Sequence, residues 1–297
     1  MSGIIDSHIH LYPPEATADP VRWAKKNKEV YWPSLVLPHA GRRSSQGWVD
    51  LDQLLLDMDA AGVEKAVLLG WYWENHETCC CQNRFYEECI RAHPDRLLAF
   101  AGVCPASGFK LSLTELEWAR DHGFIGIGEM CPYVQGGAFD DESWQAVFRW
   151  AEENRFVVNL HVSEPVGRNY PAKVQTPLID FQNLIEGFPH LKIILAHWGG
   201  GLAFYETNWA IRKIFKNVFY DTAASPLIYR RNVFKSGPSA SGIEKILYGS
   251  DYPLILYPKT ETKPGLSRFV EDIRHSGLSE EELSQLFRIN AESLFGI

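Results

Sequence analysis

The 297-residue sequence predicts a single (β/α)8 barrel, and three observations support this prediction. Short runs rich in Val, Ile, Leu and Phe recur along the chain, and stretches with helical spacing of apolar residues separate them. The runs are too apolar for half-exposed strands, which indicates a parallel sheet covered by helices. No GxGxxG follows the first run and no P-loop occurs, which disfavours the alternative, an open doubly wound sheet.

The expected strands are the apolar runs that end near a polar or aromatic residue. In chain order they are Ile4–Tyr12, Lys65–Trp71, Leu97–Cys104, Phe124–Met130, Phe156–Val162, Lys192–Trp198, Val218–Thr222 and Ile246–Tyr252. Helix signals fill the gaps. Asp50 is placed to cap a helix that Gly62 ends, and Ser279 with Glu282 forms a capping box before a C-terminal helix.

Residues 13–49 interrupt this alternation, because they contain five prolines and no sustained period. A segment after the first strand of a barrel lies over the catalytic face. We therefore expect a lid-like insertion, with a packed surface insertion as the equal alternative. The insertion is also compatible with a homodimer, and residues 1–297 otherwise form one domain.

Charge and hydropathy restrict the partners of the protein. The 29 Lys and Arg residues against 37 Asp and Glu give a net charge of −8, so we expect no nucleic acid partner. The longest apolar runs are shorter than the roughly 18 residues that cross a membrane. The N-terminus lacks the pattern of a secretory signal, and the six cysteines form no CxxC pair. We expect a cytoplasmic protein with reduced thiols and a small-molecule substrate.

Polar side chains follow several of the expected strands. His8 and His10 lie two residues apart and therefore share one face of the first strand. His161, His197 and Asp251 each end an apolar run at its carboxyl end, where barrel active sites assemble. Burying four imidazoles and a carboxylate together is costly unless a divalent metal binds them. The five residues therefore predict a metal site.

This set of residues resembles the metal-binding pattern of the amidohydrolase superfamily over the whole chain. The motifs AHWGG at 196–200 and YGSDYP at 248–253 are similar to those of one branch. That branch holds small hydrolases, lactonases and nonoxidative decarboxylases such as the aminocarboxymuconate semialdehyde and resorcylate decarboxylases. The resemblance implies that the metal is bound by His8, His10, His161 and Asp251. It implies that His197 is a second-metal ligand or a hydrogen-bond donor to the substrate.

The fourth expected strand carries Glu129 where many two-metal members of the superfamily have a carboxylated lysine. This resembles the two-metal deoxyribonuclease branch, in which a glutamate bridges the ions, and differs from the decarboxylases. Glu129 is therefore a candidate ligand of a second ion together with His161 and His197. The alternative is a salt bridge to Arg or Lys near the barrel mouth.

Aromatic and basic residues near other strand ends are candidates for substrate binding. Aromatic side chains can form the wall of a pocket for a planar substrate, and a cation can bind a carboxylate or phosphate. Packing and solvated loop charge are the alternatives. The aromatic candidates are Trp71 with its neighbours Tyr72 and Trp73, and Tyr133, Trp198 and Tyr252, and the basic candidates are Arg168 and Lys173. Asp221 at the end of the seventh strand is expected to orient a histidine or to cap a helix.

These features favour a metal-dependent hydrolase of a small amide, ester or lactone, with metal-activated water and Asp251 as general base. The alternative is a nonoxidative decarboxylase of an aromatic or unsaturated carboxylic acid, with one ion and Asp251 or His197 handling the proton. A barrel that only binds a ligand would need a substitution in the metal set, and none is present. Three imidazoles and a carboxylate favour Zn2+, with Mn2+, Fe2+ and Mg2+ as alternatives, at one or two ions per chain.

Overall fold

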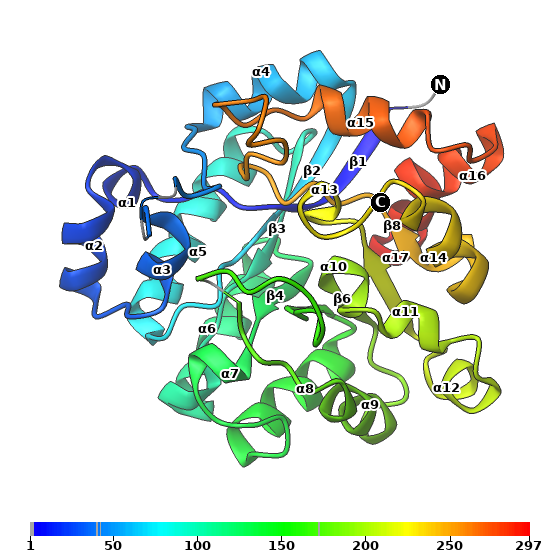
Figure 1. Ribbon diagram of the computed structural model, residues 1–297. Helices are drawn as coiled ribbons and strands as arrows, with labels where there is room; N and C mark the ends of the chain where they lie inside the picture. The colour runs from blue at the N-terminus through cyan, green and yellow to red at the C-terminus, as the bar shows by residue number, and fades with distance from the viewer. Residues whose placement is uncertain (1–2, 40, 42, 172) are drawn as a thin grey trace.

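The predicted (β/α)8 barrel is confirmed in the computed structural model, which describes residues 3–39, 41, 43–171 and 173–297. Within these ranges eight parallel strands pair in chain order around one barrel (Figure 1). Hydrogen bonds from Ser7 N–H to the Tyr248 carbonyl and from His10 N–H to the Tyr252 carbonyl join the first strand to the last segment. The strands are β1 (Ile4–Ile9), β2 (Val63–Leu69), β3 (Leu97–Ala101), β4 (Gly126–Met130), β5 (Val157–Leu160), β6 (Ile193–Leu195), β7 (Val218–Asp221) and β8 (Ile246–Leu247).

Helices connect successive strands and cover the outside of the barrel (Figure 1). The longer connecting helices are α4 (Leu51–Ala61), α5 (His76–Ala92), α6 (Phe109–Asp121), α8 (Glu142–Asn154), α9 (Leu178–Gly187), α14 (Val233–Ser241) and α15 (Ser267–Arg274). Short helices and turns are η1 (Pro105–Ser107), α7 (Pro132–Gln135), α10 (Ala196–Gly199), α11 (Leu202–Tyr205), α12 (Trp209–Ile214), α13 (Ser225–Ile228) and η2 (Ile243–Lys245). The chain ends in α16 (Glu280–Ser284), the π-helix η3 (Gln285–Ile289) and α17 (Asn290–Phe295).

The expected helix caps form as the sequence indicates. The Asp50 side chain accepts a hydrogen bond from Gln53 N–H at 2.9 Å, which satisfies a free amide of the first turn of α4. Gly62 ends the same helix with φ 72°, a left-handed conformation that glycine adopts readily. Ser279 and Glu282 form both hydrogen bonds of the capping box at α16. Local signals therefore fix these helix boundaries.

Several strands are shorter than the sequence predicts, and the reason lies in the backbone at their carboxyl ends. β6 ends at Leu195, because His197 and Trp198 adopt left-handed conformations with φ 58° and 60°. β8 ends at Leu247, and Asp251 follows with φ 65°. A left-handed residue cannot continue a strand, so these side chains stand on turns above the barrel.

The insertion forms three short helices beside α5, α1 (Pro14–Ala18), α2 (Pro20–Asn27) and α3 (Trp32–Val36) (Figure 1). Its aromatic side chains pack against residues that follow β2. The ring centroid of Trp73 lies 4.9 Å from that of Trp23 and 5.4 Å from that of Trp32, which is 1% exposed. The insertion is therefore packed at the barrel mouth by aromatic contacts, and its closure as a lid stays a prediction.

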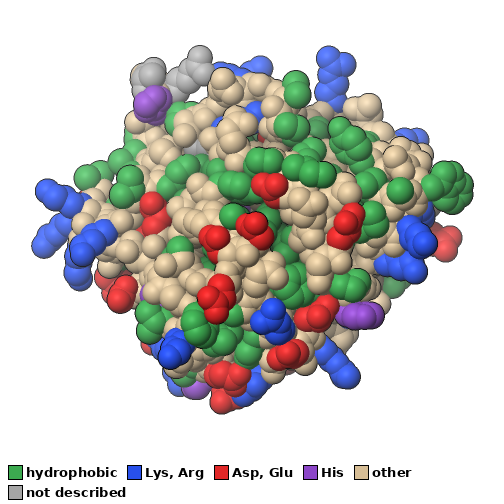
Figure 2. All heavy atoms as spheres, turned by 90° about the horizontal axis from the view of Figure 1, so that it is seen from below, with side chains coloured by type: hydrophobic (Ala, Val, Ile, Leu, Met, Phe, Trp, Pro, Cys, Tyr) green, Lys and Arg blue, Asp and Glu red, His purple; other side chains and the backbone are tan. Residues whose placement is uncertain are grey.

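The helices, thiols and surface charges of the described residues can be compared with the expectations from composition. No helix there is both long and apolar enough to cross a bilayer. The six cysteines are free thiols, as expected. On the face drawn in Figure 2, acidic side chains lie near the centre and Lys and Arg lie mostly at the edges. Acidic and basic side chains are therefore partly separated on this face (Figure 2).

Replacing Trp32 by alanine tests whether the insertion folds as one unit with the barrel. We expect Trp32→Ala to lower the free energy of unfolding by about 3–5 kcal/mol, because the indole is buried among other rings. Chemical denaturation followed by fluorescence and circular dichroism measures this change. Trp209→Ala, at an indole that is 87% exposed, is the matched control and should have little effect. A loss below about 1 kcal/mol for Trp32→Ala would contradict the packing argument.

Candidate metal centre

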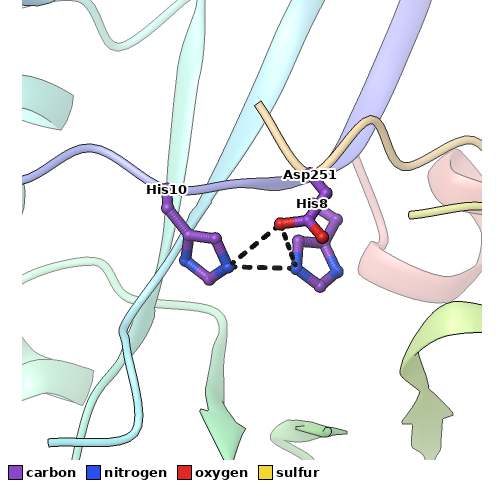
Figure 3. Close-up of side chains that lie close together, drawn as sticks. All are labelled: His8, His10 and Asp251. Carbon is purple, nitrogen blue, oxygen red and sulfur yellow. Dashed lines mark hydrogen bonds and ion pairs between the residues drawn. The ribbon is translucent and has the colours of Figure 1, made fainter. Parts of the chain in front are cut away.

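His8 and His10 bring two ring nitrogens together at the carboxyl end of β1. Their Nε2 atoms lie 3.1 Å apart, and Oδ1 of Asp251 lies 3.7 Å and 3.6 Å from them. Figure 3 shows both rings and the carboxylate around one small space. Two nitrogens that share a cation at about 2.0–2.1 Å each lie about 3 Å apart, so this spacing fits a common metal ion.

A second group of donors lies beside the first, at the ends of β4, β5 and β6. The Glu129 Oε1 atom lies 2.8 Å from Nδ1 of His161 and 3.5 Å from Nε2 of His197. Each group supplies three ligand atoms that all lie within 4.8 Å of one another, and the residues are buried. The structure thus brings together all six residues that the sequence selected as metal ligands.

Glu129 connects the two groups. Its second carboxylate oxygen, Oε2, lies 3.9 Å from Nε2 of His8 and 3.6 Å from Nε2 of His10. In the described part of the chain, its ion-pair partners are all histidines. The alternative of a salt bridge from Glu129 to Lys or Arg is therefore wrong.

Two of the donors are held by left-handed backbone. His197 donates its backbone N–H to Oδ1 of Asp221 at 2.9 Å, and Asp251 donates its N–H to the His8 carbonyl, also at 2.9 Å. A left-handed conformation costs a residue with a Cβ atom about 1–2 kcal/mol. Hydrogen bonds to neighbouring strands offset this cost and fix both side chains over the end of the barrel.

Asp221 on β7 holds two of the donors, His8 and His197, by hydrogen bonds. Its Oδ2 atom accepts a hydrogen bond from Nδ1 of His8 at 2.8 Å and from Nδ2 of Asn159 at 3.3 Å. A proton on Nδ1 leaves Nε2 of His8 with a free lone pair that faces His10 and Asp251. The expected orienting role of Asp221 agrees with this geometry.

The pKa values of this cluster follow from its carboxylates. Burial lowers the pKa of His8, but the charge and hydrogen bond of Asp221, together with the charges of Asp251 and Glu129, raise that pKa to about 10. Burial also lowers the pKa of His197, whereas its hydrogen bond with Glu129 and the charge of Asp251 raise it to about 9. Burial raises the pKa of Glu129, but the charge of His161 and hydrogen bonds from histidines hold it well below its usual value.

The charges of the cluster fit a divalent cation. Glu129, Asp221 and Asp251 are at most 6% exposed, and in the described residues every ion-pair partner of these carboxylates is a histidine. Buried carboxylates need positive charge close by, which protonated imidazoles or a bound divalent cation can supply. Imidazole nitrogens and carboxylate oxygens are also the ligands that divalent transition metals prefer.

Three of the predicted substrate residues lie around the mouth. Trp71 stacks on Tyr72 at 3.9 Å between ring centroids and lies 5.5 Å from the His10 ring. Tyr133 is half-buried and donates its hydroxyl to Asp180 at 2.7 Å. Arg168 is exposed in the loop between β5 and α9, and the described residues give it no ion-pair partner. Of these, Trp71 is the one in contact with a metal donor.

Trp198 and Tyr252 are placed differently from the expectation. Trp198 is fully buried, donates Nε1–H to the Ser225 hydroxyl at 2.8 Å and packs on Phe234 of α14. Tyr252 donates its hydroxyl to Asp57 of α4 at 2.6 Å. Each of the two residues directly follows a metal donor, and its side chain points away from the donors toward the surrounding helices. These contacts with the helices explain the positions of both side chains without a substrate.

Two further residues lie near the donors, namely Tyr72, which belongs to the predicted aromatic candidates, and Ser163, which had no predicted role. The ring of Tyr72 lies 5.2 Å from that of His161, and the Ser163 hydroxyl lies 3.1 Å from Nε2 of His161. Ser163 follows His161 by two residues, so the period of a strand could have indicated it. Tyr72 lies in the sequence Trp-Tyr-Trp, where no alternation of residue type distinguishes the side chain that faces the site.

A (β/α)8 barrel with these donors at the carboxyl ends of its strands defines a metal-dependent enzyme of the amidohydrolase superfamily. The sequence profile of the family described as Amidohydrolase matches residues 5–297, and the chain belongs to this family. No curated protein matches the sequence.

Similar solved structures include several decarboxylases. The 2,6-dihydroxybenzoate decarboxylase from Rhizobium is 19% identical, with a TM-score of 0.70 over 100% of this chain and 99% of that chain. The 5-carboxyvanillate decarboxylase from Sphingomonas paucimobilis is 17% identical, with a TM-score of 0.77 over 100% of both chains. A dihydroxybenzoic acid decarboxylase from Polaromonas, with bound manganese and 2-nitroresorcinol, is 20% identical, with a TM-score of 0.73 over 100% and 97%. These comparisons show a shared fold.

Replacing Asp221 by asparagine tests whether metal affinity depends on the hydrogen bond between His8 and Asp221. We expect Asp221→Asn to weaken metal affinity by about 10–100-fold, because the proton on Nδ1 of His8 loses its carboxylate acceptor. Competition with a chromophoric chelator measures this affinity. Asp59→Asn, at an exposed carboxylate paired with Arg96, is the control and should bind metal like the wild type. Unchanged affinity in Asp221→Asn would contradict the orienting role.

Proposed function

We propose that this enzyme is a metal-dependent nonoxidative decarboxylase of an aromatic carboxylic acid. The observation that carries the proposal is the contact between the donors and aromatic rings, with Trp71 against His10 and Tyr72 against His161. The similar solved structures support it, because they include decarboxylases of hydroxylated benzoates that match the whole chain in fold. This revises the expectation of a hydrolase, which becomes the second candidate.

His8, His10, His161 and Asp251 are the residues that would hold the catalytic ion. When bound, the cation supplies positive charge that stabilises negative charge on a carboxylate or hydroxyl oxygen of the substrate. The imidazole-rich donor set suits zinc, whereas the Polaromonas decarboxylase contains manganese. Both ions therefore belong in the first reconstitution experiments.

Decarboxylation breaks the bond between a ring carbon and its carboxylate. Carbon dioxide leaves, the electron pair stays on the ring carbon, and that carbon must then take up a proton. We assign this proton to Asp251 or His197, and their proximity supports the assignment, with Oδ2 of Asp251 3.8 Å from Nδ1 of His197. Their left-handed backbone keeps both groups over the same end of the barrel.

The aromatic rings would orient the substrate ring beside these groups. Tyr72 and Trp71 are 3% and 4% exposed, so both rings are held in place by packing and lose little freedom when a ligand binds. An apolar wall also excludes water from the reacting carbon, which favours protonation by a side chain. Trp73 and Trp32 support the wall from behind.

The activity test uses 2,6-dihydroxybenzoate and 5-carboxyvanillate with metal-loaded enzyme, and carbon dioxide release is measured. We expect turnover by the wild type and a rate about 10²–10⁴-fold lower in Asp251→Asn, with the metal still bound. Asp59→Asn is the control for an aspartate change far from the mouth. Full activity in Asp251→Asn would remove this residue from proton transfer. Hydrolysis of esters or lactones without release of carbon dioxide from either acid would overturn the proposed function.

Hydrolysis of an amide, ester or lactone is the second candidate, and the position of Glu129 favours it. Glu129 belongs to the second group of donors and also faces His10 of the first, and each group has the composition of a metal site. Two adjacent ions are typical of hydrolytic sites that activate water, and Asp251 would then take a proton from that water. A decarboxylase with one ion does not require Glu129 as a metal ligand.

Elemental analysis of the wild type and Glu129→Gln separates the two candidates. We expect about one ion per chain in both proteins, because three donors of the first group remain intact in the variant. About two ions, falling to about one in Glu129→Gln, would favour the hydrolase. Glu271→Gln, at an exposed position on α15, is the control for loss of one carboxylate.

A further inference from the structure

A hollow lies on the outer surface, away from the metal centre. Its volume is about 410 Å³, and its lining residues are Trp209, Arg212, Lys213, Lys216 and Lys245. Lys216 lies two residues before β7 and Lys245 directly precedes β8, so the hollow lies at the amino ends of these strands. His197 and Asp251 lie beyond the carboxyl ends of their strands, at the opposite end of the barrel. The hollow is therefore not part of the substrate site.

The lining of this hollow is positive in a protein whose net charge is −8. Lys245 is already bound, because its Nζ lies 2.7 Å from Oε2 of Glu206, and Arg212 lies 4.0 Å from Glu244. Lys213 and Lys216 are exposed and have no ion pair within the described ranges. Two positive charges thus face the hollow without a carboxylate.

The indole of Trp209 gives the hollow an aromatic side. It is 87% exposed, the largest aromatic exposure in the described residues. An exposed indole beside cations provides a surface on which a planar ring can stack, while the cations bind an attached anion. A volume of about 410 Å³ also falls within the range of about 300–1,000 Å³ that is typical of small-molecule sites.

We propose that this hollow binds a phosphorylated molecule with a planar ring, of the chemical class of a nucleoside diphosphate. Trp209 stacks with the ring, and Lys213 and Lys216 bind the phosphates. Two unpaired lysines match the charge of one short phosphate group, whereas a nucleic acid needs a longer basic surface. The proposal is independent of the reaction at the metal centre.

Isothermal titration calorimetry with ADP tests the proposal on the full-length, metal-loaded protein. We expect ADP to bind at submillimolar concentration, and pyrophosphate and adenosine to bind more weakly, since each offers half of the interactions. Trp209→Ala and the double variant Lys213→Ala/Lys216→Ala should each weaken ADP binding by about tenfold or more. These side chains are exposed, so the variants should fold, which thermal unfolding checks.

The matched control is Lys25→Ala/Lys26→Ala, which removes two exposed lysines from α2 in the insertion and should leave ADP binding unchanged. Three results would overturn the proposal. One is no ADP binding at millimolar concentration. Another is equal weakening by the control, which would indicate general charge attraction. The third is a dimer in sedimentation velocity that Trp209→Ala dissociates, since a second copy of the chain would then cover the hollow.

Discussion

The buried negative charge of Glu129, Asp221 and Asp251 is the constraint on which the rest of the barrel mouth depends. These carboxylates come from three different strand ends, and their positive partners are imidazoles. A carboxylate in this environment is stable only beside a cation or a hydrogen-bond donor. The histidines must therefore converge from the other strands, and the barrel must close to bring them there. Fold and metal centre are consequences of the same arrangement.

The Asp6 carboxylate contributes both to closing the barrel and to positioning the metal donors. Oδ1 of Asp6 accepts hydrogen bonds from the backbone N–H groups of His8 at 3.1 Å and Ser250 at 3.0 Å. It thus ties β1 to the segment that carries Asp251. Burial raises the pKa of Asp6 to about 7 in spite of these hydrogen bonds. The joint between the first strand and the last is therefore built from polar groups that also set the position of two metal donors.

The sequence predicts the parts of the structure that rest on local signals or on strand position. Asp50 and Gly62 bound their helix as expected, and His8, His197 and Asp251 meet because parallel strands end at one side of a barrel. The length of β6 could not be predicted, since its end depends on the hydrogen bond between His197 and Asp221, which lies on another strand. The reaction is harder to predict from the sequence than the fold, because (β/α)8 barrels catalyse many different reactions.

Ring contacts run from the insertion to the metal centre. Trp23 of α2 packs on Trp73, which lies 6.4 Å from Trp71, and Trp71 in turn lies 5.5 Å from the ring of His10. The insertion therefore shapes the wall of the site from outside the barrel. Evolution can alter which molecule fits by substitutions in a peripheral segment, while the strands and metal donors stay unchanged. Directed evolution toward new substrates has a natural starting point in residues 13–49.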